Sequence, residues 1–421
     1  MSQTNENLQQ QIHASVDNPK ALETLFRNNK QTFQQAFNNI FQEVKDNPVA
    51  QSWHERLNYR EEEISWGSKI ELLLLFAGAF VTGLIIKIPH WAGLDQENFL
   101  PRNIGLAILP IIILYLSWKQ KLSSKTMLFP LAGIAIAAIY INLVPNPAKS
   151  DSITLACIHL PLFLWSLLGF TFIGGKLNNN EAKISFLRYN GDLVVMSAVI
   201  MLAGVLFTGI NFGLFQLTGI NFQPFFENYI VIWGPASVPL FATFLVKNNP
   251  LLVNKISPVI AKIFTPLVLV TLLGFLFAVV TTSKNIYQDR EFLLTFNGLL
   301  IGVMAIIIFS VTEAAKSVNS NFNLVMLIAL SVLTIIANGI ALSAIGFRLM
   351  EYGATPNRLA VLGSNILIFL HLIAVARQLI LLFQKKTNSE KLENTIGYFL
   401  PAYSIWAAFV TFILPLLFQY K

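Results

Sequence analysis

Polar side chains inside long apolar runs are the residues of this chain that could do chemistry. Such side chains are costly in hydrocarbon unless they face a partner, a cavity or water. In the topology derived below, six lie toward one rim and a seventh is deeper: Asn142, His159, Asn211, Asn297, Asn338 and Asn365, then His371. We predict that Asn338, Asn365 and His371 line a polar cavity. The alternative is that these amides only join neighbouring helices by hydrogen bonds.

A second group of chemical residues lies in the segment GFRLMEYGATPNRL, residues 346–359. Arg348 and Glu351 are three residues apart and could pair on one helix face, and Arg358 follows the helix breakers Gly353 and Pro356. Guanidinium groups present a fork that matches a carboxylate or phosphate. We therefore predict that Arg348, Glu351 and Arg358 bind or gate an anionic ligand. A hairpin held by an ion pair is the alternative.

Two acidic residues, Asp95 and Glu97, stand in the acid-x-acid spacing between the first two apolar runs. Multi-pass membrane glycosyltransferases use a similar pair of acidic residues to hold a metal ion or to act as a catalytic base. The same side chains are also typical of a solvated turn. The segment KNIYQDRE adds Asp289, Arg290 and Glu291 on the same predicted side.

The elements that must position these residues are membrane-spanning helices. The 421 residues are 54% hydrophobic and only 12% charged, about half the charge of a soluble domain. Runs of about twenty apolar residues match the hydrocarbon thickness. The sequence therefore predicts an all-α polytopic bundle of about eleven spans, at residues 70–88, 103–118, 126–144, 153–175, 193–215, 228–246, 263–283, 293–313, 322–345, 358–384 and 397–418.

The distribution of basic residues predicts the orientation of this bundle. With eleven spans, most of the 29 Lys and Arg residues fall on the side of the N-terminus. Only eight fall on the other side: Lys87, Arg102, Lys149, Lys284, Arg290, Arg348, Arg358 and Lys421. Because cytoplasmic loops are enriched in Lys and Arg, we expect a cytoplasmic N-terminus and an external C-terminus. The net charge of +7 is then an orientation signal rather than the mark of a nucleic-acid partner.

Residues 1–68 form a separate polar region ahead of the bundle at 69–421. Asn18 followed by Pro19 is a helix-start signal, and Asn47–Pro48 repeats it. Apolar and aromatic residues recur at helical spacing between them. This amphipathic face at residues 19–46 closes a helical hairpin, lies on the membrane surface, or binds a cytoplasmic protein partner.

Helix breakers mark the sixth apolar run, where Trp233-Gly234-Pro235 is followed by Pro239. Proline removes a backbone donor and kinks a helix, and freed carbonyls inside a membrane need protein or water. A five-plus-five repeat with one added span would put the first and sixth runs at matching positions, as in transporters built from inverted repeats.

The sequence predicts no cofactor and no metal site. The single cysteine, Cys157, cannot form an internal disulfide, and no Cys or His spacing suggests a metal. Phosphate-binding loops, dinucleotide fingerprints and nucleophile elbows do not occur.

Four stretches together resemble a family of bacterial multi-pass inner-membrane proteins known only as a domain of unknown function. They are RYNGDLVVM (188–196), SPVIAKIFTPLVLV (257–270), YQDREFLLTFN (287–297) and GIALSAIGFRLMEYGATPNRLAVLGSN (339–365). The resemblance implies a bacterial plasma-membrane location and implies no activity.

Three function classes follow from these residues. The leading one is a transporter-like or permease-like protein with an outward-facing polar cavity for a small anionic solute. The second is a membrane-embedded enzyme of envelope lipid or glycan metabolism that uses Asp95 and Glu97 or the arginine segment. The third is a non-catalytic scaffold or sensor whose N-terminal helices bind a partner.

Overall fold

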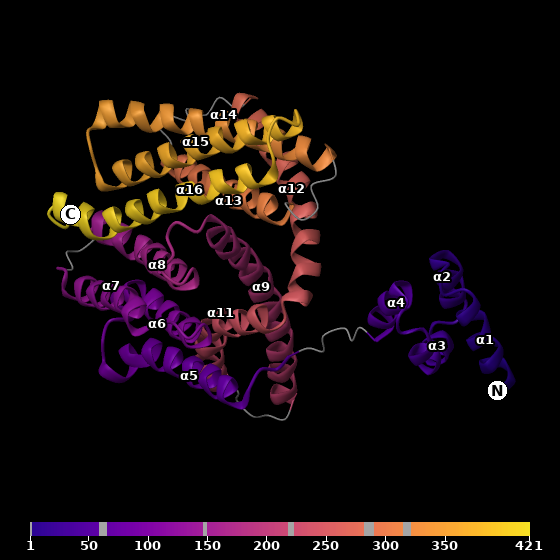
Figure 1. Ribbon diagram of the computed structural model, residues 1–421. Coiled ribbons are helices and arrows are strands. Elements are labelled where there is room, and N and C mark those ends of the chain that lie inside the picture. Colours follow the sequence, from indigo (N-terminus) through magenta and orange to yellow (C-terminus); the bar gives the residue numbers. More distant parts are fainter. Residues whose placement is uncertain (1, 59–64, 146–149, 218–222, 282–289, 315–320) are drawn as a thin grey trace. The chain divides into compact units, whose positions relative to one another are not determined.

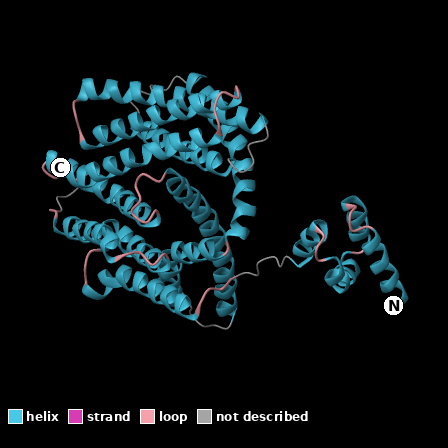
Figure 2. Ribbon diagram, viewed as in Figure 1, coloured by secondary structure: helices cyan, strands magenta, loops and turns pink. Residues whose placement is uncertain are grey.

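The computed structural model describes residues 2–58, 65–145, 150–217, 223–281, 290–314 and 321–421 (Figure 1). These residues form helices joined by turns, and no strand occurs among them (Figure 2). The chain divides into two units, residues 1–65 and residues 66–421. The predicted all-α polytopic fold is confirmed.

The N-terminal unit consists of four helices, α1 (Ser2–Ala14), α2 (Pro19–Asn28), α3 (Lys30–Val44) and α4 (Pro48–Asn58). The Asn18 side chain caps α2 as predicted by accepting from the Ala21 amide, and Asn47 accepts from the Val49 and Ala50 amides at the start of α4. A second asparagine cap, Asn29, divides the predicted continuous pattern into α2 and α3. The aromatic face packs into this unit's own core, with Phe26, Phe33, Phe37, Phe41 and Trp53 in mutual ring contact.

The described residues of the second unit contain ten helices that are long and apolar enough to cross a membrane, and the shorter apolar stretch Phe296–Thr312. The protein is therefore a multi-pass integral membrane protein in contact with lipid. Every predicted run corresponds to one of these elements, in order: α5 (Lys69–Ala92), α6 (Gln96–Lys119), α7 (Ser124–Leu143), α8 (Asp151–Phe172), α9 (Asn180–Leu217), α10 with η1 and α11 (Gln223–Phe225, Phe226–Ile230, Val231–Asn248), α12 (Pro250–Thr281), α13 (Arg290–Ala314), α14 (Asn321–Tyr352), α15 (Pro356–Phe383), and α16 with η2 and α17 (Ser389–Ala408, Phe409–Ile413, Leu414–Leu417).

Side-chain caps fix where many of these helices begin. Six helices have a capping side chain that accepts a backbone N–H from their first turn: Ser68 for α5, Asp95 for α6, Ser123 for α7, Ser150 for α8, Thr355 for α15 and Asn388 for α16. These caps satisfy amide groups that have no partner within the helix.

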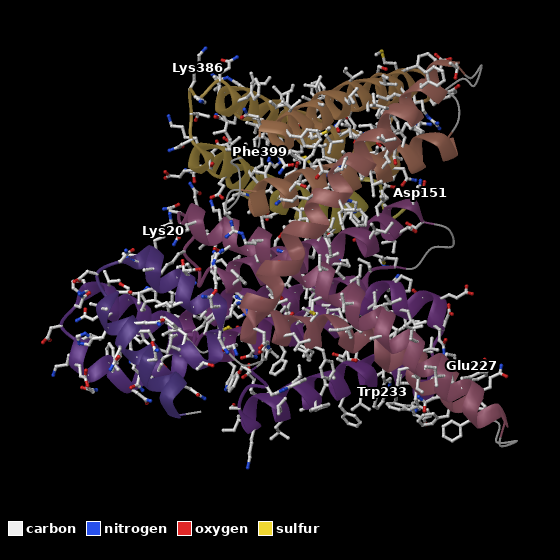
Figure 3. All side chains as sticks on the ribbon, turned by 90° about the vertical axis from the view of Figure 1, so that its right-hand side faces the viewer. Lys20, Asp151, Glu227, Trp233, Lys386 and Phe399 are labelled. Atoms are coloured by element: carbon white, nitrogen blue, oxygen red, sulfur yellow. The ribbon has the colours of Figure 1, made fainter. Side chains whose placement is uncertain are left out.

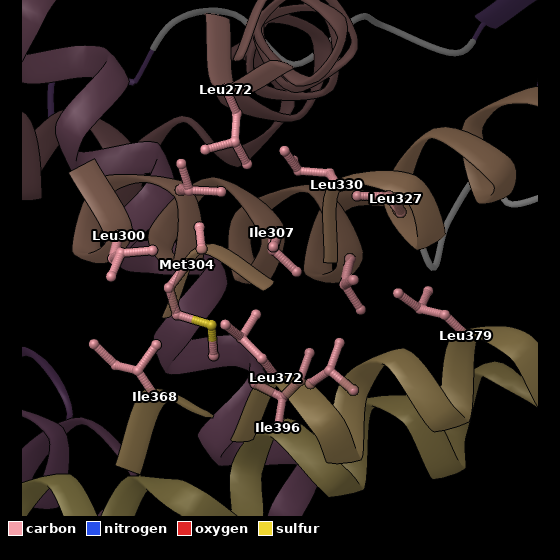
Figure 4. Packing of buried hydrophobic residues seen from close by; sticks show 14 of the residues in the cluster. Leu272, Leu300, Met304, Ile307, Leu327, Leu330, Ile368, Leu372, Leu379 and Ile396 are labelled. Atoms are coloured by element: carbon pink, nitrogen blue, oxygen red, sulfur yellow. The ribbon is translucent and has the colours of Figure 1, made fainter. Parts of the chain in front are cut away.

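The spans form two lobes that are joined by α9 and by the contacts of α8 with α15 and α16 (Figure 1). The first lobe comprises α5, α6, α7, α8 and α11, and the second comprises α12 to α16. Figure 4 shows the core of the second lobe, where Leu272, Ile307, Leu330, Leu372 and Ile396 converge from its five helices. The buried face of α9 contributes to both cores, with Ile184 and Leu187 in the second lobe and Phe186 and Tyr189 in the first.

Helix ends gather at two rims. The first is called the Lys119 rim, after the last residue of α6. At this rim Arg188 of α9 donates to the Thr312 carbonyl near the end of α13 and lies 3.8 Å from Glu393 near the start of α16. At the second, the Asp151 rim, the Ser152 amide donates to the carbonyl of Lys421. Asp151 and Glu227 lie toward one end of the helices and Lys386 toward the other (Figure 3).

Candidate functional site

Helix α5 buries a charged residue near each end of the interface that it forms with α6 and with α11 and its preceding turn. Glu71, Leu75, Thr82, Gly83 and Lys87 are buried along α5, and together they are called the strip below. From Glu71 to Lys87 the helix rises roughly 24 Å. Opposite charges therefore occupy the two ends of one buried strip.

Glu71 lies at the Lys119 rim, only 5% exposed, and receives three hydrogen bonds on one carboxylate oxygen. Tyr115 Oη donates over 2.6 Å, Lys119 Nζ over 2.5 Å and Asn248 Nδ2 over 2.9 Å. The Asn248 side-chain oxygen in turn accepts from Lys119 Nζ over 2.7 Å. This cluster ties the first turn of α5 to the last turns of α6 and α11. Its charge-assisted bonds are stronger than those between neutral groups.

A lysine one residue before Asn248 extends the polar region toward α8 and α9. Lys247 Nζ lies 3.7 Å from the Phe172 ring centroid and 5.3 Å from that of Tyr189. The Tyr189 hydroxyl shares a 2.7 Å hydrogen bond with Thr243. The Lys119 rim of the first lobe thus presents two ammonium groups, one paired with a carboxylate and one over aromatic rings.

Lys87 is the unusual group at the other end of the strip. It is 4% exposed inside a membrane-spanning helix. Its ammonium donates to Asn228 Oδ1 over 3.2 Å and lies 5.2 Å from the Tyr229 ring centroid. No carboxylate lies within ion-pair distance of Lys87 in the part of the chain that the structure describes. A buried ammonium with one neutral partner retains donors for an anion.

A second unused donor lies along the same interface. The Trp233 ring packs on Gly83, where an added Cβ would lie 2.6 Å from the ring, and contacts Phe80 edge-on and Tyr229. The Trp233 indole Nε1 is buried and has no acceptor among the described residues. Figure 3 shows Trp233 closer to the middle of the helices than Glu227. Lys87 and Trp233 both lie near Tyr229, and each therefore has N–H groups that could donate to a further acceptor.

The prolines predicted to break the sixth run do not interrupt it, because Pro235 and Pro239 are within α11, which continues as a helix to Asn248. The irregular element is the π-helical turn η1, which precedes α11. The wider turn presents Asn228 and Tyr229 to Lys87, and such turns are frequent at functional sites. The first and sixth spans do pack together, but α5 is unbroken across the membrane, with its one proline, Pro89, in its last turn.

The predicted cavity residues form a buried hydrogen-bonded line in the second lobe. Asn365 Nδ2 donates to Asn297 Oδ1 over 2.6 Å, and Asn338 Nδ2 donates to the Asn365 carbonyl over 3.2 Å. His371 shares a 3.1 Å hydrogen bond with Tyr403 and stacks on Phe399. Asn338, Asn365 and His371 are at most 1% exposed, while Asn338 Oδ1 and His371 Nε2 have no partner. These contacts join α13, α14, α15 and α16.

The arginine segment forms the turn between α14 and α15. Arg358 Nη1 donates to the carbonyls of Tyr352 and Gly353 over 2.8 and 2.6 Å, and its guanidinium lies over the Tyr352 ring. Arg358 therefore caps the end of α14, where Gly353 has a φ of +74°. Glu351 is exposed, and no ion pair joins it to Arg348, although both residues are within α14 and described. Arg348 Nη1 is buried without a partner.

The acidic residues Asp95 and Glu97 are exposed, and Asp95 has a structural role. Its side chain caps α6 by accepting from the Glu97 amide over 3.1 Å. Asp289 is outside the described residues, as are the side chains of Arg290 and Glu291. Within the described chain no three His, Cys, Asp or Glu side chains are grouped to hold a metal.

The other predicted polar residues bond locally or to a neighbouring helix. Asn142 and Asn103 exchange hydrogen bonds between α7 and α6, whereas Asn211 and His159 bond to the carbonyls four residues earlier. Sequence reasoning missed Glu71, Lys119 and Lys87 as site residues. The sequence feature that could have identified them is a charged residue at the edge of an apolar run or inside it.

A pocket of about 540 Å³ opens beside the Glu71 cluster at the end of α6. It is lined by Glu71, Leu114, Ser117, Trp118, Lys119, Lys121, Leu122 and Met127. Polar groups thus meet exposed apolar side chains at the Lys119 rim.

Comparison with protein-family models, curated proteins and solved structures finds no match to this chain. The functional argument therefore depends on the contacts above.

Proposed function

We propose that the protein is a permease-like carrier that moves a small anionic solute along the α5–α6–α11 interface. The observation that carries this proposal is Lys87, a buried ammonium in a membrane-spanning helix with one neutral hydrogen-bond partner. Intramembrane charges of this kind mark solute and ion paths. An anion beside Lys87 would supply the missing charge and could accept from Trp233 Nε1.

The Glu71 cluster gives the same interface a closure at its other end. Its hydrogen bonds hold α5, α6 and α11 together, and breaking them would separate those three helix ends. A carrier needs a path that opens at one rim while the other is closed, and buried charge at each end of one strip supports that arrangement. The second lobe, with its large apolar core, is the scaffold against which the first would move.

The proposal includes a cell location. We place the protein in a bacterial inner membrane, with the Lys119 rim and the N-terminal unit in the cytoplasm and the C-terminus outside. The basic side chains that gather at the Lys119 rim support this orientation through the positive-inside rule. Lys87 would then meet solute from the external side.

Cysteine accessibility tests the path. In a Cys157→Ser protein, Thr82→Cys places a thiol between Glu71 and Lys87, nearer to Lys87, where Thr82 is 2% exposed and bonds to the Ala107 carbonyl. A path that opens to water should let a membrane-impermeant thiol reagent modify Cys at position 82 in proteoliposomes that hold the protein in both orientations. Ser331→Cys, fully buried in the second lobe, is the matched buried control, and exposed Lys125→Cys is the positive control. Equal silence at positions 82 and 331, with modification at 125, would contradict the proposal.

The same assay tests the solute. Phosphate, sulfate or a small dicarboxylate should slow modification at position 82 when it occupies the site. Lys87→Gln should remove that protection, and Lys69→Gln, an exposed lysine on the same helix, should keep it. Cysteines at Asn338, Asn365 and His371 test whether the sequence-predicted cavity exists in the second lobe. If they react and position 82 does not, the path lies there instead.

A further inference from the structure

The pocket at the Lys119 rim combines an apolar wall with an unpaired cation. Leu114 and Trp118 are one turn apart on α6 and are 46% and 42% exposed, so they face outward from the bundle. Leu122 and Met127 continue the apolar wall around the turn into α7. The pocket is also lined by Ser117 and two lysines, Lys119 and Lys121. An apolar wall beside basic side chains is complementary to the acyl chain and the charged headgroup of an anionic amphiphile.

The charges lining the pocket leave one lysine unneutralised. Glu71 and Lys119 are paired with each other, so they add no net charge. Lys121 is exposed, and no hydrogen bond or ion pair occupies its ammonium in the described chain. The pocket therefore carries about one net positive charge, held where lipid headgroups lie.

The backbone of Lys121 has a conformation that suits glycine, so a glycine variant removes the side chain without straining the turn. The Leu122 amide donates to the Ser117 carbonyl and the Lys121 amide to the Trp118 carbonyl, which is the turn that usually ends with glycine. Lys121 has a φ of +52°, a conformation that strains an L side chain. The ends of α5 and α8 use glycine at this position, Gly93 and Gly174.

We propose that this pocket binds the phosphate-bearing headgroup of an anionic phospholipid, with Lys121 contacting the phosphate. The acyl chain lies along Leu114 and Trp118 on the outer face of α6. The site goes beyond the proposed carrier function and does not depend on it. A lipid bound in this pocket lies next to the Glu71 cluster, and therefore next to the closed end of the α5–α6–α11 interface.

The test compares lipid binding and fold stability in the same variant. Full-length protein in detergent is titrated with phosphatidylglycerol and with phosphatidylcholine of the same chain length, and bound lipid is counted by native mass spectrometry. The wild type should bind phosphatidylglycerol more tightly. Lys121→Gly should weaken that binding by about fivefold, the effect of one lysine at an anionic surface. Its thermal stability should equal or exceed that of wild type, because glycine suits the left-handed turn.

Lys385→Gly is the matched control. Lys385 ends α15 in the same hydrogen-bonded turn with a φ of +57° and lies outside the residues that line the pocket. It should keep the wild-type lipid preference. Equal loss in both variants, or no loss in Lys121→Gly, would overturn the proposal. Displacement of the lipid by millimolar inorganic phosphate would assign the pocket to free phosphate and also overturn it.

Discussion

The two lobes of the membrane unit bury different kinds of polar group. The first lobe buries charged side chains, Glu71, Lys87 and Arg102, whereas the second buries neutral ones such as Asn338, Asn365 and Thr334 among its described residues. Neutral amides exchange hydrogen bonds between helices at small net gain. A buried charge needs a partner or water, because desolvation is expensive. The second lobe can therefore be stabilised by packing and neutral hydrogen bonds, whereas the buried charges of the first lobe make its contacts sensitive to bound ions.

The largest expected effect comes from removing the carboxylate of the first lobe. Glu71→Ala leaves Lys119, Tyr115 and Asn248 without their shared acceptor. We expect a loss of about 2–3 kcal/mol in unfolding free energy, below the range for fully buried pairs because Lys119 reaches water. Reversible unfolding in mixed micelles measures it. The double variant Glu71→Leu with Lys119→Leu should recover most of the loss, since it leaves no unpaired charge, and no recovery would contradict the ion-pair account.

Close packing between α5 and α11 gives the next effect. In Gly83→Ala the new methyl group would lie 2.6 Å from the Trp233 ring, and we expect a loss of about 1–3 kcal/mol from overpacking. Gly234→Ala, whose Cβ would meet nothing within 4 Å, is the control and should be neutral or stabilising. Thermal denaturation followed by tryptophan fluorescence distinguishes the two. Equal effects would mean that α5 and α11 are not tightly packed.

The amide line of the second lobe should matter less. Asn365→Ala removes the bond to Asn297, and interhelical bonds of this kind are worth about 0.6 kcal/mol on average and up to about 1.7. The same micelle unfolding assay measures the change. A loss above that of Glu71→Ala would reverse the comparison between the lobes.

The smallest effect is predicted outside the membrane, in the N-terminal unit. Glu23 accepts from Arg27 and Arg56, and these hydrogen bonds lower the pKa of its carboxyl from 4.5. The stabilising contribution is fully present above pH 4.5 and is lost as pH falls through the lower folded pKa. Hydrogen-exchange protection factors in α2 and α4 of the full-length protein, corrected for the intrinsic exchange rate at each pH, should therefore fall slightly below pH 4.5. Glu23→Gln should remove this pH dependence, and an unchanged dependence would assign it to other groups.

Sequence reasoning recovered the spans because hydrocarbon thickness dictates the length of an apolar run. It missed how far helices continue past the apolar core. The prediction begins the fifth span at 193, whereas α9 begins at Asn180, because the polar first turns are stabilised by contacts such as Arg188 with the Thr312 carbonyl. Local signals such as Asn18 and Asn47 did predict helix starts.

The site was harder to predict because its partners are distant in sequence. Glu71 meets Asn248 across 177 positions, and Lys87 meets Asn228 across 141, and no local pattern encodes those distances. The arginine segment was visible as a motif. Its hydrogen bonds to the Tyr352 and Gly353 carbonyls depend on the left-handed turn at Gly353, which only the structure reveals.

The length of α9 gives the bilayer a mechanical role. Its 38 residues extend roughly 57 Å, against a hydrocarbon thickness of about 30 Å. Its polar first turns, from Asn180, extend beyond the hydrocarbon, and the apolar stretch that follows accommodates a thinner membrane by tilting. Because α9 packs against both lobes, a change in membrane thickness becomes a torque on their mutual angle. Spectroscopic distances between the lobes, measured in short-chain and long-chain lipids, would record α9 acting as a lever.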